Sequence, residues 1–85
     1  MPNEEYIRNQ KHFKVSIGDT VTIFRKPTEN EWDLWDCEMD EAIGKSGTVI
    51  KVSDIGILVK IPGIPGLRYQ ESSWYYPYTC MRIVR

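Results

Sequence analysis

From residue 20 onward, apolar and polar residues alternate in short stretches that are separated by turn-forming residues. These stretches are Thr20–Phe24, Gly47–Val52 and Ile57–Ile61. Alternation at every second position over four to eight residues is typical of a strand that buries one face. Because successive side chains of a strand point to opposite faces, alternate members of the third stretch should share one face. These are Ile57, Val59 and Ile61.

The C-terminal segment Ser72–Val84 holds one of the three tryptophans and three of the five tyrosines. Aromatic and β-branched residues fit the pleated, half-buried surface of a strand. Pro77 has no N–H to donate to a strand ladder, so the first strand of this segment should end there. The sequence therefore predicts a strand, a turn at Pro77–Thr79 and a closing strand over Met81–Val84.

The remaining segments are predicted from residues that break or cap regular structure. Residues 1–14 are polar without a clear period, which predicts a flexible tail ahead of one folded domain over residues 15–85. Glu38–Ile43, followed by Gly44, fits a single helical turn ended by a glycine. Pro62–Gly66 is too rich in turn formers to be anything but a loop. The helical turn should face inward through Met39, Ala42 and Ile43.

These elements predict a single all-β domain, a small barrel or sandwich of about five short strands with at most one helical turn. Eighty-five residues suffice for one domain and no more. No apolar run approaches the length of a transmembrane helix. The acidic N-terminus, Met1–Glu5, has no hydrophobic region of the kind a signal peptide needs. We therefore expect a cytoplasmic protein with no membrane partner.

Charge is distributed unevenly along the chain, although the net charge is only −1. Seven acids and no lysine or arginine lie between Glu29 and Glu41, and the rest of the chain carries a net charge of +6. Such a separation of charge influences which partners approach which surface. The acidic segment has no apolar period up to Asp36, so we expect a long, self-repelling loop that is mobile unless its charges are neutralised.

The sequence offers little chemistry for catalysis or metal binding. The single histidine, His12, lies in the predicted tail, and no serine or cysteine occupies a nucleophile motif. Cys37 and Cys80 lie far apart in a chain without a secretion signal, which is more typical of free buried thiols than of a disulfide. The acidic segment lacks the spacing of a calcium-binding loop. We expect a protein that is not an enzyme and that holds no metal or cofactor.

Aromatic residues are too numerous for one side of so small a core, so some should be exposed beside the acidic loop. The set comprises Trp32, Trp35, Tyr69, Trp74, Tyr75, Tyr76 and Tyr78. Exposed tryptophan and tyrosine mark binding surfaces because they dominate interface hot spots. We predict a groove for a protein or peptide with basic residues. The alternative is that these aromatic residues only pack within the core or form contacts between copies of the chain. The predicted floor is Trp32, Trp35, Trp74, Tyr76 and Tyr78, and the predicted rim is Asp33, Asp36 and Glu38.

Single-stranded nucleic acid is the rival ligand, because small barrels stack bases on aromatic residues within a basic groove. In this chain the aromatic residues adjoin acids, which repel phosphate, and the basic residues are scattered. A nucleic-acid site would therefore have to use the sheet face opposite the acidic loop. We therefore favour a peptide over nucleic acid as the ligand.

Three motifs in sequence order carry a family resemblance. They are Gly18-Asp19-x-Val21, Met39-Asp40-Glu41-x-Ile43-Gly44-Lys45-x-Gly47-Thr48-Val49 and Trp74-Tyr75-x-Pro77. In this order they resemble SH3-like barrels and look most like the Mind bomb/HERC-type domains of large ubiquitin ligases, and the resemblance covers Gly18 to Val84. The chain is also similar to small stand-alone proteins of bacteriophages and large viruses that carry a W…MD…IGK…TV…YYP pattern. The resemblance implies a small SH3-like β-barrel with a binding role, such as a phage or viral accessory protein.

Overall fold

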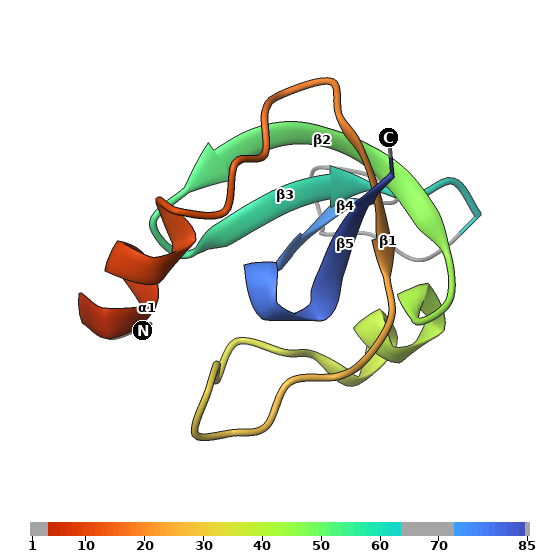
Figure 1. Ribbon diagram of the computed structural model, residues 1–85. Coiled ribbons are helices and arrows are strands. Elements are labelled where there is room, and N and C mark those ends of the chain that lie inside the picture. The colour runs from red at the N-terminus through yellow and green to blue at the C-terminus, as the bar shows by residue number, and fades with distance from the viewer. Residues whose placement is uncertain (1–3, 64–72, 85) are drawn as a thin grey trace.

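A computed structural model describes residues 4–63 and 73–84 of the chain. Five strands form one antiparallel sheet in the order β4-β3-β2-β1-β5, preceded by a short helix and interrupted by two 3-10 turns (Figure 1). The elements are α1 Glu4–Gln10, β1 Thr20–Ile23, η1 Cys37–Ala42, β2 Ser46–Ser53, β3 Gly56–Lys60, β4 Ser73–Tyr76, η2 Tyr78–Cys80 and β5 Met81–Val84. The predicted small all-β fold of about five short strands is confirmed. Residues 64–66 of the predicted loop and Tyr69 lie outside the described residues.

Strand β2 is the longest strand and joins the two halves of the sheet. It pairs with β1 near its start and with β3 along most of its length. The pairing register shifts between Val49 and Lys51, and β2 curves strongly along its length (Figure 1). A bulge of this kind bends the strand and increases its twist. Gly47 allows the backbone of Lys60 to approach β2 closely, because a Cβ at position 47 would lie 2.4 Å from the carbonyl oxygen of Lys60.

The core takes residues from all five strands, from α1 and η1 and from the acidic loop. The three alternate residues predicted from the sequence are all buried: Ile57 and Val59 lie in β3, and Ile61 directly follows its end. Leu58, on the opposite face, is also only 2 % exposed, so β3 is buried on both faces. Strict alternation predicts only one buried face for this strand. The core cluster consists of Tyr6, Val21, Ile23, Trp32, Met39, Ala42, Val49, Ile57, Val59, Ile61, Tyr76 and Met81.

The predicted helical turn forms as η1, in 3-10 geometry. Met39 and Ala42 are buried as expected, but Ile43 is 39 % exposed, which corrects its predicted inward position. Ile43 is the C-cap residue and has extended backbone angles, so it leaves the helical spacing that would have placed it beside Met39. Gly44 follows at φ +87°, a conformation that favours glycine, and ends the turn as the sequence predicts.

The prediction of a flexible tail over residues 1–14 is wrong for the described part of that segment. Residues 4–10 form α1, which lies beside the end of the β2–β3 hairpin (Figure 1). Gln10 donates from Nε2 to the carbonyl oxygen of Ser53 at 2.6 Å, and Tyr6 belongs to the core cluster. Phe13 packs against the ring of Tyr78 with centroids 5.7 Å apart. The N-terminal segment is therefore part of the folded domain.

Candidate functional site

The first half of the acidic segment is organised around Glu31. Its carboxylate accepts hydrogen bonds from Nη1 and Nη2 of Arg25 at 2.8 and 2.9 Å and from the backbone N–H of Thr28 at 3.1 Å. The hydrogen bonds from the Arg25 side chain hold the pKa of Glu31 below its ordinary value. Arg25 therefore neutralises the charge of Glu31, and the hydrogen bonds of this carboxylate fix the turn that begins at Thr28.

Trp32 anchors the same loop to the body of the protein. Its side chain is only 3 % exposed, and its Nε1–H donates to the carbonyl oxygen of Ile55 at 2.9 Å. The indole lies against Gly56, where an added Cβ would come within 3.3 Å of the ring. Trp32 was predicted as an exposed floor residue, and its burial corrects that placement. The physical reason is that so small a core depends on the large buried area that an indole contributes.

Trp35 lies three positions further and is only half-buried. Its Nε1–H donates to Oδ1 of Asp40 at 2.7 Å, and its ring meets Tyr76 edge-on with centroids 5.9 Å apart. Tyr76 itself is fully buried, which corrects its placement as an exposed floor residue. Burial raises the pKa of the Tyr76 hydroxyl, which has no hydrogen-bond partner in the structure. Trp35 therefore presents part of an indole to solvent from a fixed position.

A groove of about 480 Å³ opens beside Trp35, and we call it the loop groove. It is lined by Lys26, Pro27, Glu29, Asn30, Trp32, Asp33 and Trp35. Three of the eight predicted site residues, Trp32, Asp33 and Trp35, thus meet at one hollow. The sequence reasoning missed the other four, Lys26, Pro27, Glu29 and Asn30, although a proline that ends a strand beside an acidic aromatic segment was a usable signal.

The other five predicted residues do not line the loop groove. The side chain of Asp36 caps η1 by accepting from the backbone N–H of Glu38 at 3.0 Å, and Glu38 is exposed in the first turn of η1. Trp74 is half-buried on β4 opposite Val59, and Tyr76 is core. Tyr78 lies in η2, where its ring packs against Tyr6. The structure therefore does not assemble the single aromatic floor predicted from the sequence.

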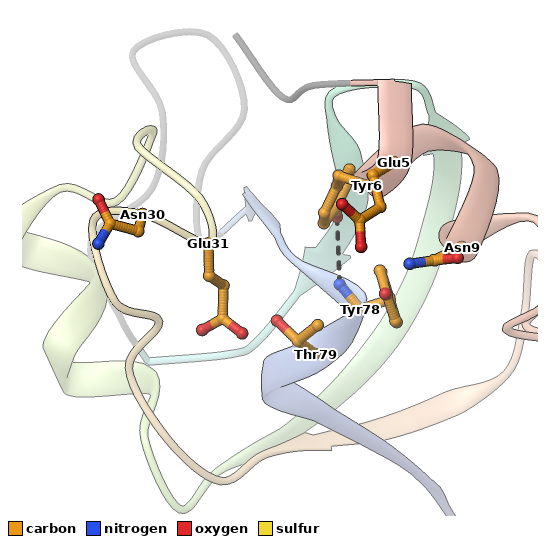
Figure 2. A pocket seen from close by; sticks show the side chains of 7 residues that line it. All are labelled: Glu5, Tyr6, Asn9, Asn30, Glu31, Tyr78 and Thr79. Carbon is orange, nitrogen blue, oxygen red and sulfur yellow. Dashed lines mark hydrogen bonds between the residues drawn. The ribbon is translucent and has the colours of Figure 1, made fainter.

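A second, smaller hollow of about 230 Å³ lies between α1 and the acidic loop, and we call it the α1 cavity (Figure 2). Helix α1 contributes one wall, the acidic loop contributes the opposite wall, and η2 lies between them (Figure 2). Its lining residues are Glu5, Tyr6, Asn9, Asn30, Glu31, Tyr78 and Thr79. Sequence reasoning missed this cavity because it treated α1 as a tail. The signal available was the pair Glu4 and Glu5 ahead of Arg8, the charge order that suits a short helix.

Across residues 4–63 and 73–84, no group of three or more His, Cys, Asp or Glu side chains is placed to hold a metal ion. In the same residues, no helix is long and apolar enough to cross a membrane. Of the two cysteines, Cys37 is exposed and Cys80 is buried, and both are free thiols. Comparisons of the chain with protein families, with curated proteins and with solved structures find no match.

Proposed function

We propose that this protein is a non-enzymatic binding module that takes a peptide segment bearing a basic residue into the loop groove. The observation that carries the proposal is the convergence of Trp35, Asp33 and Glu29 on one groove. An indole and carboxylates together suit a lysine or arginine side chain, which can gain both charge attraction and a cation–π contact of about 0.5–2 kcal/mol.

Rigidity supports this proposal. Trp35 is held on one side by Asp40 and on the other by the ring of Tyr76. Trp32 is tied to Ile55, and Glu31 is tied to Arg25. A loop fixed at these points loses little conformational entropy when a ligand binds, so more of the contact energy becomes affinity.

The electrostatics of the groove also favour a cation. Among the described lining residues, Glu29 and Asp33 carry carboxylates and Lys26 carries an ammonium group. Lys26 Nζ lies 4.0 Å from Asp40 Oδ1, a carboxylate outside the lining. A basic peptide is therefore favoured over a polyanion at this groove, since phosphate groups would meet like charges.

We also propose that the chain is an SH3-like barrel of the Mind bomb/HERC kind, as the motif resemblance implies, and that it works inside the cell. Several residues of the resembling motif have structural roles here. Met39 Sδ accepts from the N–H of Asp36, Gly44 has a positive φ, and Gly47 has no room for a Cβ. The motif therefore supports the fold, whereas the ligand is argued from the groove.

The test is selection of a random peptide library displayed on phage, with the purified protein as bait. We expect the selected peptides to share a lysine or arginine and to bind the Trp35→Ala variant roughly tenfold or more weakly. Phe24→Ala is the matched control, because Phe24 is an exposed aromatic residue outside the loop groove. Thermal melts confirm that each variant remains folded.

Two results would overturn the proposal. The first is selection of peptides without basic residues. The second is tight binding of single-stranded oligonucleotides whose affinity falls steeply with salt and is lost on charge reversal at Lys51 and Lys60. That pattern would instead indicate nucleic acid bound to the sheet.

A further inference from the structure

The α1 cavity joins three segments that are distant in the sequence. Glu5, Tyr6 and Asn9 come from α1, Asn30 and Glu31 from the acidic loop, and Tyr78 and Thr79 from η2 (Figure 2). The N–H of Tyr78 donates to the hydroxyl of Tyr6 at 3.2 Å and fastens α1 to η2 (Figure 2). With about 230 Å³, the cavity is smaller than most small-molecule pockets and comparable with a single large side chain.

Its lining carries negative charge and hydrogen-bond acceptors. Among the described residues that line it, Glu5 and Glu31 carry carboxyl groups, and none is a lysine or arginine. Glu31 is already engaged by Arg25, which is not part of the lining. In the described part of the chain, Glu5 forms no ion pair, so its exposed carboxylate remains for a ligand.

An aromatic wall completes the cavity. The half-buried ring of Tyr78 packs against Tyr6, with centroids 5.2 Å apart, and against Phe13. A ring supported in this way can stack with a planar cation. Asn9 and Asn30 line the cavity from α1 and from the acidic loop (Figure 2). Arginine suits this arrangement better than lysine, because its flat guanidinium group offers several donors in one plane and stacks on aromatic rings.

The cavity adjoins the loop groove, since Asn30 lines both. We propose that the α1 cavity is a second subsite that receives an arginine side chain from the peptide bound in the loop groove. This proposal rests on the proposed function for the identity of the ligand, but the cavity can be tested separately. It makes α1 part of the binding site and gives the partner two basic residues, one on each side of Asn30.

The cavity is probed with N-acetyl-arginine methylamide, and N-acetyl-citrulline methylamide serves as the uncharged control of similar shape. Binding is followed by two-dimensional NMR. The side-chain amide of Asn9 and the backbone amide of Thr79 report on the α1 cavity, and the indole N–H of Trp35 reports on the loop groove. We expect the arginine compound to give saturable shifts at Asn9 and Thr79, with the citrulline compound bound about fivefold more weakly.

The matched variants are Glu5→Gln and Glu4→Gln. Both residues are exposed in the first turn of α1, but only Glu5 lines the cavity. Glu5→Gln should weaken the response of Asn9 and Thr79 about fivefold, whereas Glu4→Gln should leave it unchanged. Equal losses in the two variants would indicate a general charge effect and would overturn the subsite.

The outcomes separate the two proposals. Shifts at Trp35 alone leave the loop groove standing and overturn the α1 cavity. Shifts at Asn9 and Thr79 support the cavity, even if peptide selection on the loop groove fails. Equal affinity for the arginine and citrulline compounds overturns recognition of the cation. No response at either set of reporters overturns the cavity.

Discussion

The backbone N–H of Tyr78 donates a hydrogen bond to the hydroxyl of Tyr6, a residue 72 positions earlier in the chain. The same hydroxyl donates to Oε1 of Gln10 at 2.7 Å, and Gln10 in turn donates to the carbonyl oxygen of Ser53. This chain of hydrogen bonds links α1, η2 and the end of β2. It explains how a helix of only seven residues is held in place, since so short a helix is not stable in isolation.

Replacing Tyr6 with phenylalanine should therefore destabilise the protein by about 1–3 kcal/mol, because it removes the partner of the Tyr78 N–H and of Oε1 of Gln10. Urea unfolding followed by fluorescence measures the change. Arg8→Ala, an exposed substitution on the same helix, is the control and should lie within about 0.5 kcal/mol of wild type. Equal stability of the Tyr6→Phe variant would mean that the linkage contributes nothing.

The tryptophans should differ in their effect on stability. Trp32→Ala removes a nearly fully buried indole and should cost about 3–5 kcal/mol, a large part of the stability of a small domain. Trp74→Ala removes a half-buried side chain that packs against the core, and it should cost less. If the alanine variant of Trp32 does not fold, Trp32→Phe keeps a ring and leaves the carbonyl oxygen of Ile55 unpaired. Equal losses at Trp32 and Trp74 would contradict the burial described here.

The strands could be predicted from the sequence because each has a local signature. Alternation located β1, β2 and β3 to within about two residues, and Pro77 located the corner between β4 and β5. The helix α1 could not be recognised by period, because seven residues bury only Tyr6 and Gln10. Its position depends on contacts with residues more than 40 positions away, which local patterns do not contain.

The candidate site was harder to predict for the same reason. Trp32 and Trp35 are both tryptophans in an acidic loop, and nothing in their immediate neighbours shows which one is buried. Trp32 is the buried one because its indole N–H donates to the carbonyl oxygen of Ile55 and its ring fits against Gly56, which has no side chain. Both partners lie on the β2–β3 hairpin. Burial in a loop is decided by tertiary partners, whereas burial in a strand is partly decided by alternation.

Cys80 should resist chemical modification, whereas Cys37 should react. Burial raises the pKa of the Cys80 thiol to about 11, from an ordinary value of 9.0. Iodoacetamide at pH 8 should therefore modify one thiol per native chain, at Cys37, and both thiols in denaturant, which peptide mass spectrometry measures.

The unfolded chain loses the Cys80 proton at lower pH than the folded chain, so stability should fall as pH rises from about 9 to about 11. Cys80→Ala should lack that component of the fall.

The pair of Arg25 and Glu31 should contribute stability that depends on pH. The pKa of Glu31 is lowered in the folded state from an ordinary value of 4.5, mainly by the hydrogen bonds from Arg25. Its contribution is therefore present above about pH 4.5 and is lost as the pH falls through the lowered value. Wild type should be more stable than Glu31→Gln at pH 7, and the difference should shrink at pH 3. Urea unfolding at both pH values measures it, with Glu41→Gln as control. An equal difference at both values would exclude the charge as the cause.

Charge on the loop groove should act mainly on how fast a basic peptide associates, whereas Trp35 should act mainly on how fast it leaves. Asp36 is a poor residue for this test, because its side chain caps η1 and its loss would cost about 0.5–2 kcal/mol of stability. Glu29→Lys reverses a charge in the groove lining, and Glu41→Lys makes the same change outside it. Stopped-flow measurements with a library-selected basic peptide should show slower association for Glu29→Lys than for Glu41→Lys. Trp35→Ala should instead speed dissociation. Unchanged association in a folded Glu29→Lys variant would remove the acidic rim from the mechanism, because long-range attraction must appear in the encounter step.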